Sequence, residues 1–427
     1  MGLIMLTTLS RWNRWGGATL SAGIQRDITK KIDSLMNTSD IIVLIGMRRS
    51  GKTTVLFQLM DILENQGISK EAILHVNFEE PSLASALNLD LLDTIYNEYR
   101  ANICPKGKVY VFFDEIQNVP QWERWVRARN ETEQIKIILT GSSANLMSRE
   151  LGTVLTGRHI SFIVSPLSFS EYLHFKQIKQ PTVLLPIGAS HEINHALEHY
   201  LYWGGLPEVV LSESDDRRRY LLKQYFDDLL FKDVSMRHEI RDIALLRNLA
   251  VYLLTQTASL ISYHRIAKQF GISLDKASSY CSFLQEAFLV DFLPFFSLKT
   301  AERNRHPFKV HAVDLGLRTV TALTGSEDKG RLMETAVCHQ IKRNDNYSVY
   351  YWKGTQEIDF LIREGHVVTQ LIQVSQDVSS ENVLQRELNA FSEAEIQFSK
   401  AETRLIVGKQ PKKTEPSITP LWLFLLE

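Results

Sequence analysis

The chain contains few cysteines. Only Cys104, Cys281 and Cys338 occur among its 427 residues. Their number is odd and their spacing is wide, so both a disulfide framework and a cysteine-based zinc site are disfavoured. Such thiols are usually buried or inert in a reducing compartment, and we therefore expect a cytoplasmic protein.

The chain also lacks an excess of charge of either sign. It has 48 lysines and arginines against 49 aspartates and glutamates, which gives a formal net charge of −1. A protein this close to neutrality has no overall electrostatic attraction for nucleic acids. Any contact with DNA must then come from a local basic patch.

Long hydrophobic runs are missing as well. Residues 1–9 include a short apolar run without the basic start or cleavage signature of a signal peptide. The C-terminal run Leu421–Leu426 is far too short to cross a bilayer and predicts a last buried strand. We therefore expect no membrane association. There is no internal repeat or low-complexity linker, and a chain of 427 residues predicts two to four domains.

What the sequence does contain is a glycine-bounded loop with a specific spacing. Residues Gly46–Thr53 read G-x-x-x-x-G-K-T, directly after the apolar run Ile41–Ile45 and directly before the helical pattern Thr54–Met60. This order of strand, loop and helix is the context of a phosphate-binding loop, whose backbone N–H groups point at phosphate oxygens. A chance match in a glycine turn is disfavoured by that context.

The loop therefore predicts binding of a nucleoside triphosphate, ATP, with Mg²⁺. Lys52 would reach the β- and γ-phosphates, and the hydroxyl of Thr53 would ligate Mg²⁺. The expected nucleotide-binding residues of this segment are Gly46, Met47, Arg48, Arg49, Ser50, Gly51, Lys52, Thr53 and Thr54.

A second motif supplies two acids. The apolar run Val109–Phe113 ends in Asp114 and Glu115, which predicts a central parallel strand that delivers carboxylates to its C-terminal edge. Asp114 would hold Mg²⁺ through water, and Glu115 would orient or deprotonate the attacking water. An acidic turn after a strand is common by itself, but its pairing with the loop favours ATP hydrolysis.

A third strand, Ile135–Thr140, leads into hydroxyl residues at 142 and 143 that are suited to sensing a γ-phosphate. A helix is expected over residues 144–155. Arg158 then precedes a further strand at Ile160–Val164. Two interpretations stay open for Arg158: an arginine finger that reaches a neighbouring subunit's γ-phosphate, or a surface arginine at a helix end.

The middle of the chain predicts helices over Glu192–Arg241 and then a winged helix over Ile261–Phe292, read from its order of helix, glycine turn, helix and strand. DNA contact and protein packing are equally open for this segment. The basic run Lys299–His311 indicates either a phosphate-contacting loop or a solvated surface. In a DNA-binding winged helix the groove-facing residues would be Ser273, Asp275, Lys276, Ser278 and Ser279.

Together these motifs resemble an AAA-type ATPase of the bacterial and archaeal group related to the STAND signalling ATPases. The resemblance adds the Pro-Leu-Ser-Phe motif that begins at Pro166 and the double arginine Arg48-Arg49. It implies that Arg158 is the arginine finger and that Pro207, in the Gly204–Pro207 motif, packs on the adenine.

The resemblance extends to the C-terminal third, which is similar to a restriction-endonuclease-like domain of that group. There a helix glutamate, a strand aspartate and the glutamate of a Glu-x-Lys pair hold Mg²⁺, while the lysine of that pair steers the attacking water. Glu334 and Asp359 match the first two acids. Gln373 and Ser375 stand at the Glu-x-Lys positions, so the resemblance implies a domain that has lost cleavage activity.

The predicted fold class is α/β: a P-loop NTPase of AAA type with a parallel sheet, a helical lid, a winged helix and a C-terminal restriction-endonuclease-like domain. The expected boundaries are 1–185, 186–240, 241–298 and 299–427. The leading functional hypothesis is a homo-oligomeric ATPase that couples turnover to DNA binding or remodelling. The alternative is a STAND-like scaffold in which nucleotide controls assembly around a protein partner.

Overall fold

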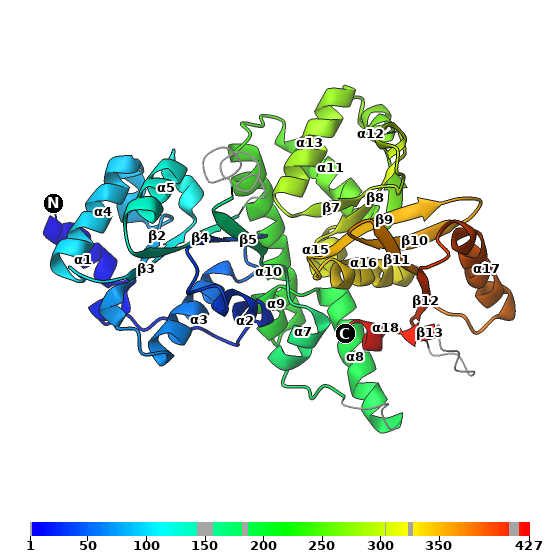
Figure 1. Cartoon of the computed structure of the whole chain (residues 1–427). Helices are drawn as coiled ribbons and strands as arrows, with labels where there is room; N and C mark the ends of the chain where they lie inside the picture. The colour runs from blue at the N-terminus through cyan, green and yellow to red at the C-terminus, as the bar shows by residue number, and fades with distance from the viewer. Residues whose placement is uncertain (1, 143–156, 182–186, 304, 323–327, 410–417) are drawn as a thin grey trace. The chain divides into compact units, whose positions relative to one another are not determined.

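The computed structural model describes residues 2–142, 157–181, 187–303, 305–322, 328–409 and 418–427 (Figure 1). Its backbone contacts divide the chain into two compact units, Met1–Ser165 and Pro166–Glu427. Each unit builds its own sheets and its own hydrophobic core.

The first unit is organised around a parallel five-stranded sheet with the order β2-β3-β4-β1-β5. Its strands are β1 (Ile41–Ile45), β2 (Ile73–Asn77), β3 (Val109–Asp114), β4 (Ile135–Gly141) and β5 (His159–Ile163). The apolar runs predicted as strands β1, β3, β4 and β5 are thereby confirmed. Strand β4 separates β1 from β3, so its C-terminal end lies between the ends of those two strands.

Helices cover both faces of this sheet, which is why its central strands are apolar along their whole length. Phe112 belongs to the core formed with α2 and α3, whereas the next residue, Phe113, contacts Trp125 of α5 with ring centroids 5.6 Å apart. Figure 1 shows α3 on one side of the sheet and α4 with α5 on the other. The helices are α1 (Gly2–Ser10), α2 (Asp27–Asp33), α3 (Lys52–Asn65), α4 (Leu89–Asn102) and α5 (Trp122–Thr132).

The second unit begins with helices, as the sequence pattern predicts. Ser168 starts the first of them with a capping box, in which its side chain accepts from the backbone of Glu171 and the Glu171 side chain accepts in return. The elements are α7 (Phe169–Phe175), α8 (Ile187–Trp203), α9 (Pro207–Leu211), α10 (Asp215–Asp228) and the π-helix η6 (Leu229–Met236).

A small antiparallel sheet with the order β6-β8-β7 follows, together with the four helices α11 to α14. Gly271 takes a φ of 62° and ends α12, and the side chain of Ser273 then caps α13. The sheet joins strands on both sides of the boundary expected between residues 298 and 299. The elements are α11 (Ile243–Thr255), β6 (Ser259–Ile261), α12 (Tyr263–Phe270), α13 (Leu274–Glu286), β7 (Val290–Leu293), α14 (Thr300–Arg303) and β8 (Phe308–Ala312).

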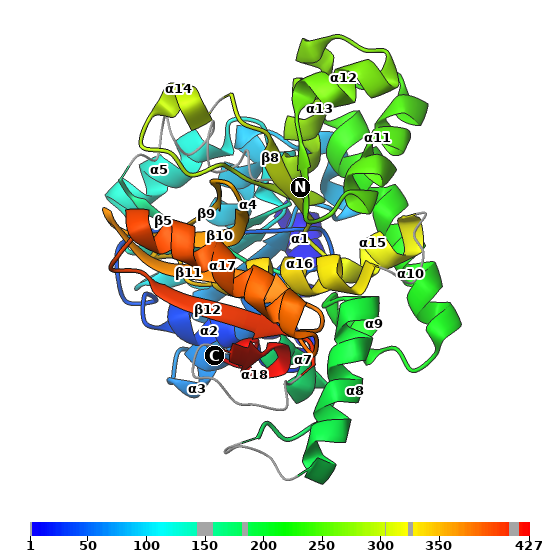
Figure 2. The same cartoon turned by 90° about the vertical axis from the view of Figure 1, so that its right-hand side faces the viewer.

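The C-terminal part holds a mixed five-stranded sheet with the order β13-β12-β11-β10-β9. Strands β9, β10 and β11 are antiparallel, and β12 and β13 continue in parallel from β11. Helix α17 packs its buried residues on this sheet (Figure 2). The elements are α15 (Leu315–Thr321), α16 (Lys329–Ile341), β9 (Tyr347–Lys353), β10 (Glu357–Glu364), β11 (Val367–Ser375), α17 (Glu381–Gln397), β12 (Glu402–Val407), β13 (Ile418–Pro420) and α18 (Leu421–Phe424).

Two expectations need correction here. The run Leu421–Leu426 is not a strand: it forms the short helix α18, with the extended Pro420 as its N-cap. The basic run Lys299–His311 is not wholly a surface either, because Lys309 and His311 are each 1% exposed on β8. The end of that basic run therefore lies in a buried strand.

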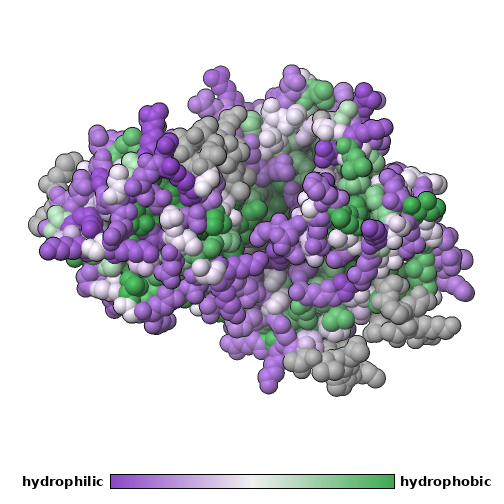
Figure 3. Space-filling view, in the orientation of Figure 1, coloured by the Kyte–Doolittle hydropathy of each residue, from purple (hydrophilic) through white to green (hydrophobic). Residues whose placement is uncertain are grey.

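No helix within the described ranges is both long and apolar enough to span a membrane. The face of the molecule drawn in Figure 3 is mostly hydrophilic, and its hydrophobic residues gather in small separate groups.

Candidate functional site

The predicted phosphate-binding loop connects the C-terminal end of β1 to the first turn of α3. Gly46 has a φ of 152°, and a Cβ there would lie 2.4 Å from the carbonyl oxygen of Val164. Gly51 has a φ of 100°, where an L side chain is strained. Both glycines are therefore required by the backbone, as the motif predicts, and the loop opens onto a helix N-terminus that favours anions.

Lys52 lies inside this loop and is 5% exposed. Its Nζ donates to the carbonyl oxygens of Gly46 at 3.1 Å and of Met47 at 3.2 Å. The same ammonium lies 3.7 Å from Oε1 of Glu115. The ammonium is thus held over the loop, at the position that the motif assigns to a phosphate-binding lysine.

Thr53 and Asp114 meet at the same edge of the sheet. The Thr53 hydroxyl donates to Oδ2 of Asp114 at 2.7 Å, and the hydroxyl of Thr140, on β4, donates to the other carboxylate oxygen. Burial and the neighbouring charge of Glu115 raise the pKa of Asp114 to about 6, although both hydroxyls oppose the rise. A hydroxyl and a carboxylate in contact are oxygen donors of the kind that Mg²⁺ binds, so these residues fit the ion.

Glu115 follows β3 in a left-handed conformation with a φ of 54°, an uncommon conformation for a residue other than glycine. Its backbone N–H donates to the Thr140 hydroxyl at 2.9 Å, and Gln117 Nε2 donates to its carboxylate at 2.5 Å. Burial works against ionisation of Glu115, but Lys52, Gln117 and other polar neighbours outweigh burial and hold its pKa below the ordinary value. Glu115 is therefore a carboxylate at neutral pH.

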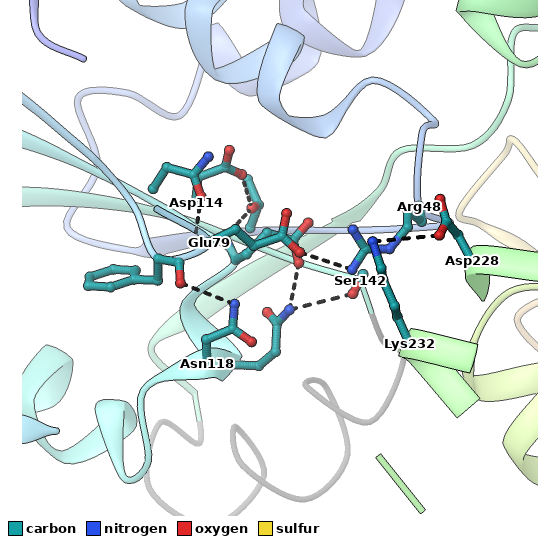
Figure 4. Close-up of polar contacts among 12 residues, drawn as sticks. Arg48, Glu79, Asp114, Asn118, Ser142, Asp228 and Lys232 are labelled. Carbon is teal, nitrogen blue, oxygen red and sulfur yellow. Dashed lines mark hydrogen bonds and ion pairs between the residues drawn. The ribbon is translucent and has the colours of Figure 1, made fainter. Parts of the chain in front are cut away.

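Three residues at this site were not foreseen from the sequence. Gln117 bridges Glu115 and the Ser142 hydroxyl, which lies 3.5 Å from its Nε2. Glu79, just after β2, accepts from Arg48 of the loop at 3.0 Å (Figure 4). Arg26 donates to the carbonyl oxygen of Ser50 at 2.8 Å. These residues lie outside the motifs, and only their proximity in the folded chain connects them to the loop.

The remaining loop residues lie between β1 and the first turn of α3. Met47 and Ser50 are buried, Arg49 is exposed with a φ of 69°, and Thr54 is half-buried in the first turn of α3. The expected hydroxyl at position 143 and the expected helix over 144–155 lie outside the described residues.

Arg158 lies at the opposite edge of the same sheet. Its carbonyl oxygen accepts from the N–H of Ile41 at 3.0 Å, so it stands at the start of β5, beside the start of β1. Its guanidinium forms an ion pair with Glu131 of α5 and is 46% exposed. Arg158 is thus separated by the length of a strand from the loop of its own chain.

In the second unit, Pro207 is the first residue of α9 and follows the glycines of its motif. Gly205 is locked in place: its N–H donates to Asp314 at 2.8 Å, its carbonyl accepts from Leu167 N at 2.7 Å, and a Cβ there would lie 2.5 Å from Leu167 O. Burial raises the pKa of Asp314 to about 6. The two motifs at 166–172 and 204–207 therefore contact each other, and the contact of Pro207 with adenine stays a prediction.

The residues expected for a nuclease-like site also come together. Glu334 on α16 and Asp359 on β10 both accept from Nζ of Lys309, and Gln373 and Ser375 lie on the neighbouring strand β11. Lys309 was read from the sequence as part of a basic run. Among the described residues, no group of three or more His, Cys, Asp or Glu side chains could hold a metal ion.

Comparison with known sequences places an AAA domain at residues 38–173 and a domain of unknown function at residues 194–329. The chain is 31% identical over 376 residues to "Uncharacterized protein MJ1544" of Methanocaldococcus jannaschii, covering 86% of this chain and 81% of that protein. It is 29% identical over 335 residues to an uncharacterized protein of Haemophilus influenzae, covering 77% of this chain and 80% of the relative.

Among solved structures, the chain is similar to the Aeropyrum pernix ORC1 protein in complex with DNA, with a TM-score of 0.31, 14% identity, and coverage of 70% of this chain and 92% of that one. AMPPCP-bound DnaA from Aquifex aeolicus gives a TM-score of 0.27 and 13% identity over 61% of this chain and 86% of that one. The P-loop NTPase fold is shown by the parallel sheet, the loop and the AAA-domain match.

Proposed function

Since this chain belongs to the same family as the M. jannaschii protein MJ1544 and carries an AAA domain, we propose that it is a Mg²⁺-dependent ATPase that couples ATP turnover to DNA. An AAA-type domain is by nature a nucleotide-binding module. The finer parts of the proposal are the residue roles, the magnesium dependence, the assembly into homo-oligomers and the coupling to DNA.

One observation carries the proposal: Lys52, Thr53, Asp114 and Glu115 meet at one edge of the parallel sheet. Lys52 and Thr53 begin α3, Asp114 ends β3, and Thr53 and Asp114 are 61 residues apart in sequence. The hydroxyl of Thr140, on the intervening strand, contacts the Asp114 carboxylate and the backbone N–H of Glu115. Ligand sites of open α/β sheets form at this carboxyl edge.

The chemistry follows from these positions. The loop N–H groups and Lys52 would bind and orient the β- and γ-phosphates. Thr53 and Asp114 would hold Mg²⁺, which supplies neutralisation of phosphate charge when bound. Glu115, ionised and fixed by Thr140 and Gln117, would accept a proton from the attacking water. Glu115 would thus act in the ionised form that its contacts favour.

Coupling to DNA is supported by the arrangement of α11–β6–α12–α13–β7–β8, which matches the helix and strand order of a winged helix. On α12, His264, Arg265 and Lys268 are exposed, and on α13 Ser273 and Ser279 are exposed. The basic residues Lys299 and Arg305 are exposed on the connection between β7 and β8. These side chains would supply local phosphate contacts that the neutral chain as a whole does not.

The test is ATP turnover by the wild type and by Glu115→Gln, with and without single-stranded, duplex and branched DNA. We expect the variant to bind ATP normally and to lose turnover by about 10²-fold or more. The matched control is Glu123→Gln, the same substitution on the half-buried face of α5, which should keep full activity. Normal hydrolysis by Glu115→Gln would refute the assigned role.

The turnover measurements with DNA test the proposed coupling of ATP hydrolysis to DNA. Stimulation of turnover by DNA, reduced by Arg265→Ala together with Arg305→Ala, supports coupling. Nucleotide-dependent oligomers without any DNA response would favour the alternative, a STAND-like assembly scaffold for a protein partner.

A further inference from the structure

Lys309 is the buried centre of a carboxylate cluster. It lies on β8, and its side chain is 2% exposed. Its Nζ is 2.8 Å from Oε1 of Glu334, 2.7 Å from Oε1 of Glu357 and 3.0 Å from Oδ1 of Asp359. These three acids come from α16 and β10, so one ammonium is surrounded by carboxylates from two separate elements.

The ammonium has one carboxylate neighbour for each of its three N–H donors. A lysine has three N–H donors and no acceptor, and here three carboxylates surround it at hydrogen-bonding distance. Burial alone would lower the pKa of Lys309, but the three carboxylates outweigh burial and hold its pKa well above the ordinary value. The ammonium is therefore charged and fully engaged, and a second cation could enter only by displacing it.

The side-chain amide of Gln373, on the neighbouring strand, forms hydrogen bonds to other groups. Gln373 Oε1 accepts from the backbone N–H of Asp359 at 3.0 Å, and its Nε2 donates to Glu387 at 3.0 Å. The second oxygen of Asp359 accepts from Val374 N at 2.9 Å. Gln373 is thus tied to backbone and to another acid, so only the three carboxylates around Lys309 are left to face a cation.

We propose that the ammonium of Lys309 is the resident cation of this cluster, in the place where a nuclease-like domain would hold a divalent metal ion. The three carboxylates then serve to fix β8 against α16 and β10. This inference extends the expectation, drawn from the sequence, that the domain has lost cleavage activity, and it needs no assumption about ATP hydrolysis.

The lysine also joins two sheets. Strand β8 pairs with β6 and β7, whereas Glu357 and Asp359 belong to the five-stranded sheet. The ion pairs span 25 residues to Glu334 and 50 to Asp359. An internal ammonium at this point links the small sheet to the C-terminal sheet through buried ion pairs.

The experiment removes the ammonium by substitution and then adds Mn²⁺ as a probe of the cluster. Mn²⁺ is titrated into the nucleotide-free full chain and followed by electron paramagnetic resonance and by thermal unfolding. The wild type should bind no Mn²⁺ at this cluster. Lys309→Met removes the charge and leaves a side chain one heavy atom shorter, and it should gain one Mn²⁺ site with a Kd on the order of 10⁻⁴ M. A further Asp359→Asn substitution should abolish that site.

The control is Lys136→Met, which removes another buried ammonium, one that donates to backbone carbonyl oxygens instead of carboxylates. It should gain no Mn²⁺ site. If Lys309→Met does not fold, the double variant Lys309→Met/Glu357→Gln relieves the repulsion and keeps two acids for the metal. Failure of both variants, once folded, to bind Mn²⁺ would overturn the proposal. So would wild-type Mn²⁺ binding that Asp359→Asn abolishes. Because nucleotide is absent, neither result depends on the ATPase.

Discussion

The most discriminating prediction concerns Arg158. Strands β5 and β1 pair residue for residue from His159 with Ile41 to Ile163 with Ile45. At about 3.3 Å per residue, Arg158 lies roughly 16 Å from the strand end at which the phosphate loop begins. That is farther than an arginine side chain reaches. If Arg158 contributes to catalysis, it must therefore act on a nucleotide bound by another copy of the chain.

The expected size of the effect follows from the charge that an arginine finger neutralises. Arg158→Ala should lower turnover by about 10³–10⁵-fold, equivalent to roughly 4–7 kcal/mol in the activation free energy. ATP affinity should stay unchanged because the residue is remote from its own loop. The control is Glu131→Ala, which removes the partner of Arg158 but keeps the guanidinium. An exposed ion pair contributes only about 0–1 kcal/mol, so this variant should stay active and folded.

The assay is steady-state ATP hydrolysis by mixtures of Arg158→Ala and Glu115→Gln. Each variant is inactive alone, but in mixed oligomers an intact Glu115 site can face an intact Arg158. Random assortment in a ring makes about one interface in four of this kind. Activity that stays absent in every mixture, although the measured mass shows mixed oligomers, would refute action between subunits. Full activity of Arg158→Ala alone would refute the finger.

Four further outcomes are expected for residues of the first unit. Thr140→Val removes the hydroxyl that donates to the Asp114 carboxylate and accepts from the Glu115 backbone N–H, and it should lower turnover about tenfold or more with little change in ATP affinity, measured by steady-state kinetics. Gly46→Ala places a methyl group 2.4 Å from the carbonyl of Val164 and should abolish nucleotide binding, measured by calorimetry. Lys136→Met leaves three loop carbonyl oxygens without their donor and should cost about 2–4 kcal/mol in denaturant unfolding. Burial lowers the pKa of His75 to about 4, so the unfolded chain alone gains this proton between about pH 6.5 and 4; the free energy of unfolding should fall by up to about 3 kcal/mol across that window, and a flat profile by chemical denaturation would contradict it.

The residues of the proposed nucleotide site could be named from the sequence because each part of the site is a local motif. A loop bounded by Gly46 and Gly51 needs only its flanking strand and helix, and the acids after β3 need only a buried strand before them. The sheet order then brings the two together. Gln117, Glu79 and Arg26 could not be found in the same way, because each enters the site through tertiary contact and none belongs to a spaced motif.

The contacts of the C-terminal part were harder to predict from the sequence, for a physical reason. A basic residue in a charged run is usually solvated, and nothing local marks Lys309 as the partner of acids 25 and 50 residues later. The final apolar run was predicted as a strand because short apolar segments have no diagnostic period. Pro420 ends β13 and is the N-cap of α18, but it has no capping side chain, so nothing local marked the start of a helix.

The packing around Asp314 has a consequence for how sequences of relatives are interpreted. One buried carboxylate accepts from Gly205 and Leu317, and Cβ atoms at Gly205 and Gly316 would collide with neighbouring backbone. These positions constrain one another whether or not a nucleotide is bound. A relative whose phosphate loop has decayed should still retain the glycine–proline element, because the element is needed for folding. Its presence in an alignment is therefore a marker of common architecture and a poor marker of catalytic competence.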